Sequence, residues 1–101
     1  MKPLDKLTRE SVQAELQLAR ALRARSRAIN RLVDARRAAN ETRKLYLARQ
    51  ATEGAYRFAV QRRNQARGVW ARAVTRSEAA RARAFDARFE LREAQRSGAP
   101  L

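Results

Sequence analysis

Apolar side chains in the first half of the chain recur at the spacing of an α-helix. At 100° per residue, five of them share one face: Leu18, Leu22, Ile29, Leu32 and Val33. Four arginines fall on the opposite face: Arg20, Arg23, Arg27 and Arg31. Residues 16–33 contain no acidic residue. The pattern predicts an amphipathic helix with a cationic ridge opposite its apolar face.

The second half of the chain has two apolar faces instead of one. The broader face holds Leu45, Tyr56, Val60, Trp70, Val74, Phe85 and Phe89. The nearly opposite face holds Leu47, Phe58, Val69 and Leu91, and with Ala80 this set recurs every 11 residues. A repeat of 11 residues keeps a seam straight or slightly right-handed along a helix. Two apolar faces predict that this helix contacts neighbours on two sides, in a bundle or an oligomer.

The ends of the helical region carry recognisable signals. Thr8 is expected to cap a helix that begins at Arg9, and a start nearer Asp5 is the alternative. At the other end, Gly98 followed by Pro100 predicts where the last helix stops. Residues 1–7 and 98–101 are therefore expected to be flexible ends.

Where the chain turns decides between three all-α architectures. Weak helix breakers occur at Asn40, over 50–54 and at Gly68. A turn near 50–54 predicts an antiparallel helical hairpin or coiled coil. Turns near 40 and 68 predict a three-helix bundle, and no turn predicts a single long helix. The hairpin is preferred, because the first apolar stripe would then cover one face of the second helix and leave the other open to a partner.

Composition limits the size of the core and the number of domains. The 101 residues suffice for one domain, 1–101, and 22 of the hydrophobic residues are alanine. Only six residues are Phe, Trp or Tyr. A thin core of this kind is expected to need an oligomer or a partner for stability.

Charge defines the chemistry of that partner. The chain carries 24 Lys and Arg against 10 Asp and Glu, a net charge of +14, and 21 of the cations are arginine. Such a chain repels itself and attracts anions. The excess is spread over both halves, +8 in residues 1–50 and +6 in 51–101. An anionic partner, either nucleic acid or an acidic protein surface, is therefore expected.

The sequence contains no recognisable catalytic motif. The chain has no Cys and no His, its four Ser lie in no recognisable motif, and its three Gly are isolated. We expect no enzyme activity, no catalytic residues, no metal site and no cofactor. No apolar run is long enough to span a bilayer, and the first residues lack the apolar core of a secretory signal. The expected location is the cytoplasm or a large assembly such as a virion.

Nonspecific binding to nucleic-acid phosphates is the leading functional hypothesis from charge alone. Residues 57–76 hold six arginines and no acid, and arginine makes bidentate phosphate contacts. The predicted anion-binding residues are Arg20, Arg23, Arg27, Arg31, Arg57, Arg62, Arg63, Arg67, Arg72 and Arg76. Nearby aromatic residues, Tyr56, Phe58 and Trp70, lie on the apolar faces and are interpreted as core.

The alternative hypothesis is a structural subunit whose arginines dock on acidic protein surfaces in a virion, a secretion apparatus or another large complex. In composition the chain is similar to the small stalk proteins of type III secretion, which are basic helical hairpins. This similarity covers no motif and transfers no residue role. The predicted residues of helix packing or partner contact are Leu18, Leu22, Ile29, Val33, Leu45, Tyr56, Phe58, Val69, Trp70, Val74, Phe85 and Phe89.

Overall fold

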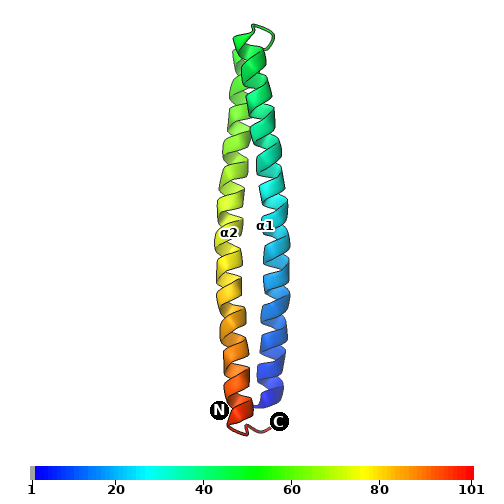
Figure 1. The fold of residues 1–101 in the computed structure, drawn as a ribbon, viewed down its shortest axis with the longest axis vertical. Helices are drawn as coiled ribbons and strands as arrows, with labels where there is room; N and C mark the ends of the chain where they lie inside the picture. Colours follow the sequence, from blue (N-terminus) through cyan, green and yellow to red (C-terminus); the bar gives the residue numbers. More distant parts are fainter. Residues whose placement is uncertain (1) are drawn as a thin grey trace. The chain divides into compact units, whose positions relative to one another are not determined.

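Two long α-helices make up almost the whole chain. The structure is a computed structural model and describes residues 2–101, in which α1 spans Leu4–Leu47 and α2 spans Glu53–Arg96 (Figure 1). The predicted all-α helical hairpin is confirmed, and the three-helix bundle and the single helix are excluded. The contacts divide the chain into two compact units: the loop unit, residues 24–74, and the terminal unit, residues 2–23 with 75–101. In each unit a stretch of α1 packs against a stretch of α2.

Burial along both helices follows a repeat of seven residues. In α1 the buried and half-buried row is Leu7, Ser11, Ala14, Leu18, Ala21, Arg25, Ala28, Leu32, Ala35, Ala39, Thr42 and Tyr46. In α2 it is Tyr56, Ala59, Arg63, Ala66, Trp70, Ala73, Ser77, Ala80, Ala84, Ala87, Leu91 and Ala94. The steps alternate between three and four residues, which is the spacing of a coiled coil. We call these two rows the seam.

The seam is made chiefly of small side chains. Alanine occupies every second seam position of α2, at 59, 66, 73, 80, 87 and 94, and four consecutive such positions of α1, at 14, 21, 28 and 35. A methyl group reaches little beyond the helix backbone, so helices joined by alanine pack near the short end, about 8 Å, of the usual interaxial range. Close packing of this kind leaves little room for large side chains between the helices.

Several large apolar residues predicted from the sequence to pack therefore remain exposed. Leu18, Ile29, Tyr56, Trp70 and Val74 are half-buried, as expected of packing residues. The exposed ones are Leu22, Val33, Leu45, Phe58, Val69, Phe85 and Phe89. The interpretation of Phe58 as core is wrong, because 60% of its surface is exposed. Large side chains that flank the seam remain outside the core, because the alanine seam already joins the helices.

The helices are joined by residues 48–52, which overlap the turn expected near 50–54. The end of α1 is closed by two backbone hydrogen bonds, from the N–H of Gln50 to the C=O of Leu45 (2.7 Å) and from the N–H of Arg49 to the C=O of Tyr46 (3.0 Å). This motif requires a left-handed residue, which here is Arg49 with φ of 61°. Thr52 then caps the start of α2, because its Oγ1 accepts a hydrogen bond from the N–H of Ala55 (3.1 Å).

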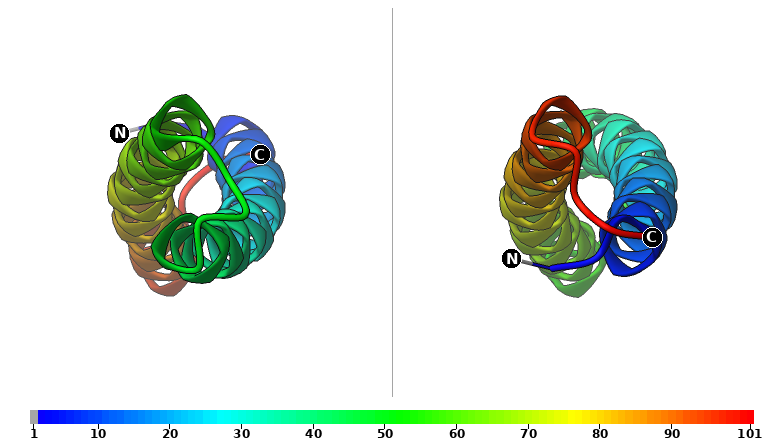
Figure 2. Two further views of the ribbon diagram at one scale, coloured as in Figure 1. Left: turned by 90° about the horizontal axis from the view of Figure 1, so that it is seen from above. Right: turned by 90° about the horizontal axis from the view of Figure 1, so that it is seen from below.

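The terminal unit is closed by the last residues of the chain (Figure 2). Gly98, with φ of 68°, ends α2, as the sequence predicts. The tail then returns to α1, where the N–H of Leu4 donates to the C=O of Pro100 at 2.7 Å. Leu7 is buried against Ala94 and Ala99. These contacts tie together two ends that the sequence predicts to be flexible.

The predicted start of the first helix needs a correction. The helix begins at Leu4, which confirms the alternative start nearer Asp5, so Thr8 does not cap it. The Oγ1 of Thr8 instead donates a hydrogen bond to the C=O of Leu4 at 2.8 Å, within the helix. The physical reason is the packing of Leu4 and Leu7 against the returning tail, which holds the first turn in place.

Candidate interaction surfaces

Folding concentrates the positive charge in one of the two units. The loop unit holds 13 Lys and Arg against three Asp and Glu, a net charge of +10 in 51 residues. The terminal unit holds 11 against seven, a net charge of +4. The two halves of the sequence differ little in charge, so this asymmetry appears only when the middle of the chain is folded together. The loop unit is therefore the stronger candidate for binding an anionic partner.

Ion pairs neutralise little of the charge in the loop unit. Two pairs there are Lys44–Glu41 at 3.7 Å and Arg57–Glu53 at 2.8 Å, both within one helix and both beside the loop. Arg27, Arg31, Arg62 and Arg72 are exposed, and none has a carboxylate within ion-pair distance among residues 2–101. Exposed charges without a local counterion are available to a partner.

The ten predicted anion-binding arginines are divided between the two units. Arg20, Arg23 and Arg76 lie in the terminal unit and the other seven in the loop unit. Within the loop unit, Arg57 is engaged by Glu53. Arg63 occupies the seam, where its Nε is buried without a hydrogen-bond acceptor. An arginine in the seam serves the packing of the two helices and is less accessible to a ligand.

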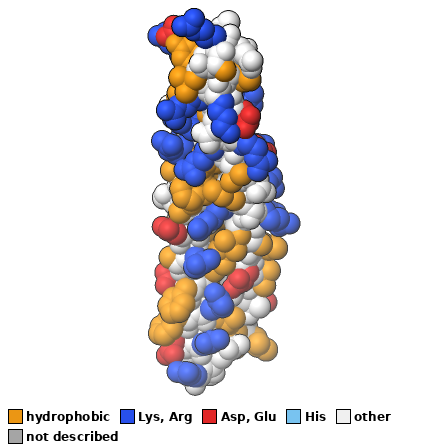
Figure 3. Space-filling view, turned by 45° about the horizontal axis from the view of Figure 1, so that its top comes forward, with side chains coloured by type: hydrophobic (Ala, Val, Ile, Leu, Met, Phe, Trp, Pro, Cys, Tyr) orange, Lys and Arg blue, Asp and Glu red, His pale blue; other side chains and the backbone are white. Residues whose placement is uncertain are grey.

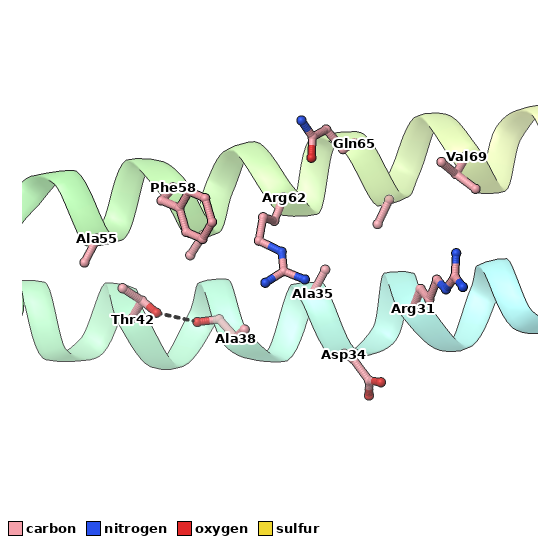
Figure 4. Close-up of a pocket in the computed structure, with 12 residues that line it drawn as sticks. Arg31, Asp34, Ala35, Ala38, Thr42, Ala55, Phe58, Arg62, Gln65 and Val69 are labelled. Atoms are coloured by element: carbon pink, nitrogen blue, oxygen red, sulfur yellow. Dashed lines mark hydrogen bonds between the residues drawn. The ribbon is translucent and has the colours of Figure 1, made fainter.

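A groove with an alanine floor opens between the two helices of the loop unit (Figure 4). Its volume is about 730 Å³, and its floor carries Ala35, Ala38, Ala55, Ala59 and Ala66. Phe58 and Val69 of α2 stand at its sides, 60% and 39% exposed. Arg31 of α1 and Arg62 of α2 also line it. We call this site, defined by these nine residues, the alanine groove.

The charged side chains of the alanine groove are arranged asymmetrically. Arg62 extends from α2 toward α1, and its Cζ lies 5.9 Å from the centroid of the Phe58 ring, within cation–π range (Figure 4). Asp34 is the acidic residue at this groove, and Figure 4 shows its carboxylate pointing away from Arg62. The groove therefore combines an apolar floor with positive charge that no carboxylate of the groove neutralises.

The terminal unit has an apolar surface of a different character. Its exposed large apolar side chains are Val12, Leu16, Leu22, Phe85, Phe89 and Leu101. An ion pair between the Nε of Arg88 and the Oε1 of Glu15, 2.9 Å long, joins α2 to α1 in the same part of the unit. Here positive and negative side chains pair with one another, which fits the smaller net charge. On the face drawn in Figure 3, apolar and charged side chains alternate along the molecule.

Other kinds of site receive no support from the geometry. No helix within residues 2–101 combines the length and the apolar character that crossing a membrane requires. The same residues contain no cluster of three His, Cys, Asp or Glu side chains able to hold a metal ion. Comparisons with protein-family models, with curated proteins and with solved structures find no match.

The alanine groove is the surface that sequence reasoning missed. When the hydrophobicity of side chains is summed at 100° per residue, alanine contributes little. The seam and the floor of the groove therefore do not stand out in the sequence. The signal that could have revealed them is the series of six alanines spaced seven residues apart, from Ala59 to Ala94. That series places one continuous row of methyl groups along α2.

Proposed function

We propose that the protein is a non-enzymatic subunit of a larger assembly, and that its loop unit binds an acidic protein surface. The observation that carries the proposal is the combination of a net charge of +10 with exposed apolar side chains in the same 51 residues. The exposed side chains of Phe58 and Val69 line the alanine groove together with Arg31 and Arg62. Exposed apolar surface rimmed by charge is typical of protein–protein contact.

An acidic protein matches this surface better than a phosphate backbone does. Phosphates attract arginine but offer no apolar surface to cover Phe58 and Val69. A protein surface can supply both carboxylates and apolar side chains, and aromatic and arginine residues are the ones enriched at protein interfaces. Charge alone ranks nucleic acid first, and the exposure of the aliphatic Val69 together with Phe58 reverses that order.

Nucleic-acid binding is the second candidate, and two observations favour it. Four arginines of the loop unit are exposed and have no carboxylate within ion-pair distance among residues 2–101: Arg27, Arg31, Arg62 and Arg72. Such arginines are typical of surfaces that follow a phosphate backbone. An exposed Phe58 beside Arg62 also offers a stacking surface for an unpaired base.

A competition experiment separates the two candidates. The full chain is titrated onto a fluorescent random-sequence DNA duplex over a salt series, with poly-L-glutamate added at matched charge. Under the proposal, polyglutamate displaces the duplex as effectively as unlabelled duplex does, because carboxylates satisfy the arginines. Polyglutamate that competes at least tenfold more weakly than duplex, with log K falling by about 0.9 per contacted phosphate against log salt, would favour nucleic acid instead.

A further inference from the structure

We propose that the alanine groove receives an α-helix of the partner protein, one whose apolar heptad seam is flanked by Asp or Glu. This inference rests on the proposed function, since it specifies the shape and chemistry of the acidic partner. The partner helix would pack against both helices of the loop unit as a third helix, on the side where the alanine groove is open.

The first argument is that the residues that line the groove include one row with heptad spacing on each helix. On α1, four of the five lining positions, 31, 35, 38 and 42, are spaced by four, three and four residues, and Asp34 lies beside this row. On α2, positions 55, 59, 62, 66 and 69 continue the same alternation, and Phe58 and Gln65 line the groove beside that row. A helix with a heptad pattern meets such rows along its length. The 11 steps from residue 31 to residue 42 span about 16 Å, which matches about three turns of an occupant helix.

The second argument is the shape of the floor. Ala38 and Ala55 are exposed, and a methyl group is all that separates a docking helix from the backbone at these positions. Phe58 and Val69 rise beside the floor as exposed apolar walls. An extended peptide would leave unpaired backbone N–H and C=O groups over this apolar floor, whereas a helix pairs its own. The groove therefore selects a helical occupant.

The third argument is charge. Arg31 and Arg62 line the groove on opposite helices, and neither forms an ion pair with the described residues. Charged residues that flank a heptad seam decide which helices pair and how they are oriented. Arg62 extends from α2 toward α1, the helix that carries Arg31, so an occupant with Asp or Glu beside its seam would meet both arginines.

The same charge disfavours a second copy of this chain as the occupant. Docking the loop unit of one copy into the groove of another would bring together two regions of net charge +10 each, with three acidic residues apiece. Like charges at this density repel one another strongly. The occupant is therefore expected to be a different, acidic polypeptide.

A designed peptide tests the inference. The probe is a fluorescein-labelled helix of three heptads, with Leu and Ala at the seam positions and Glu on both flanks. Its affinity for the full chain is measured by fluorescence anisotropy. Phe58→Ala and Arg62→Glu are each expected to raise the Kd at least about tenfold, because each removes a central contact. Both side chains are exposed, so we expect the fold to be retained, and circular dichroism verifies this.

Matched variants outside the groove serve as controls. Phe85→Ala removes an equally exposed phenylalanine from the terminal unit, and Arg37→Glu reverses an exposed arginine of the loop unit that does not line the groove. Each is expected to change the Kd of the peptide less than about threefold. Equal losses from Phe58→Ala and Phe85→Ala, or from Arg62→Glu and Arg37→Glu, would overturn the groove as the binding site.

Three other results would also overturn it, and they separate its failure from that of the proposed function. Peptide binding that is insensitive to Phe58→Ala, while polyglutamate still displaces duplex DNA, rejects the groove and retains the proposed function. A single-stranded oligonucleotide that displaces the peptide and loses affinity on Phe58→Ala would assign the groove to nucleic acid. A dimer in sedimentation that Phe58→Ala dissociates would assign it to a second copy.

Discussion

Among residues 2–101, two adopt a left-handed backbone, and they are chemically unlike. Gly98 ends α2 with φ of 68°, and Arg49 ends α1 with φ of 61°. Each stands at the same position of the same helix-ending motif. A side chain disfavours this conformation by roughly 1 kcal/mol, and glycine avoids that cost. The loop end of α1 is therefore held in a less favourable backbone state than the end of α2.

Substitution at these two positions should change stability in opposite directions. Arg49→Gly is expected to raise the free energy of unfolding by about 1 kcal/mol, and Gly98→Ala to lower it by about 1 kcal/mol. Urea denaturation followed by circular dichroism measures both. Destabilisation by Arg49→Gly would show that the Arg49 side chain contributes more than its backbone costs.

Aromatic residues separate into those that stabilise the hairpin and those that face outward. Trp70 occupies the seam and is half-buried, whereas Phe85 is 64% exposed. Trp70→Ala is expected to lower the free energy of unfolding by about 2 kcal/mol, and Phe85→Ala by less than about 0.5 kcal/mol. Thermal denaturation of both variants measures the difference. A comparable loss in the two variants would mean that Phe85 is buried in solution.

At the scale of the helices, the alanine seam determines what is core and what is surface. The helices are held together by a row of methyl groups, and Leu32 is the one large apolar side chain among the described residues that is less than 2% exposed. Packing this close is sensitive to added volume, because an extra isobutyl group has no space between the backbones.

Enlarging a seam alanine should therefore be costly where enlarging its neighbour is not. Ala80→Leu, at a position 3% exposed, is expected to lower the free energy of unfolding by about 2 kcal/mol. Ala79→Leu, on the exposed face one residue away, is expected to change it by less than about 0.5 kcal/mol. Chemical denaturation of the pair provides the measurement, and equal losses would contradict the seam described here.

At this scale, some features of the fold follow from the sequence and others do not. The helix content, the hairpin and the end of α2 at Gly98 follow from the composition and from local helix-ending signals in the sequence. The partition between core and surface does not, because Leu22, Val33 and Phe58 outweigh alanine in any sum of apolar side chains. Side-chain size misleads here, since the small residues set the distance between the helices and the large ones are left outside.

At the scale of the whole molecule, the two units differ in charge and in how that charge is satisfied. The terminal unit pairs Arg88 with Glu15 across its helices, whereas the loop unit carries a net charge of +10 with ion pairs beside the loop. The arginine ridge predicted from the sequence, Arg20 to Arg31, is divided between the two units. Position in the fold, more than position in the sequence, identifies the arginines available to a partner.

Two variants of equal net charge test the central claim most directly. One reverses four exposed arginines of the loop unit to Glu, namely Arg27, Arg31, Arg62 and Arg72. The other reverses four exposed arginines of the terminal unit, namely Arg20, Arg23, Arg76 and Arg83. Each set lowers the net charge of the chain by eight, from +14 to +6, so total charge cannot explain a difference between them.

The decisive measurement is the affinity of both variants for poly-L-glutamate at one ionic strength. Reversal in the loop unit is expected to weaken binding at least about tenfold more than reversal in the terminal unit, because the loop unit falls from +10 to +2. Equal losses in the two variants would show that the charge acts as a whole, and would contradict the loop unit as the binding surface.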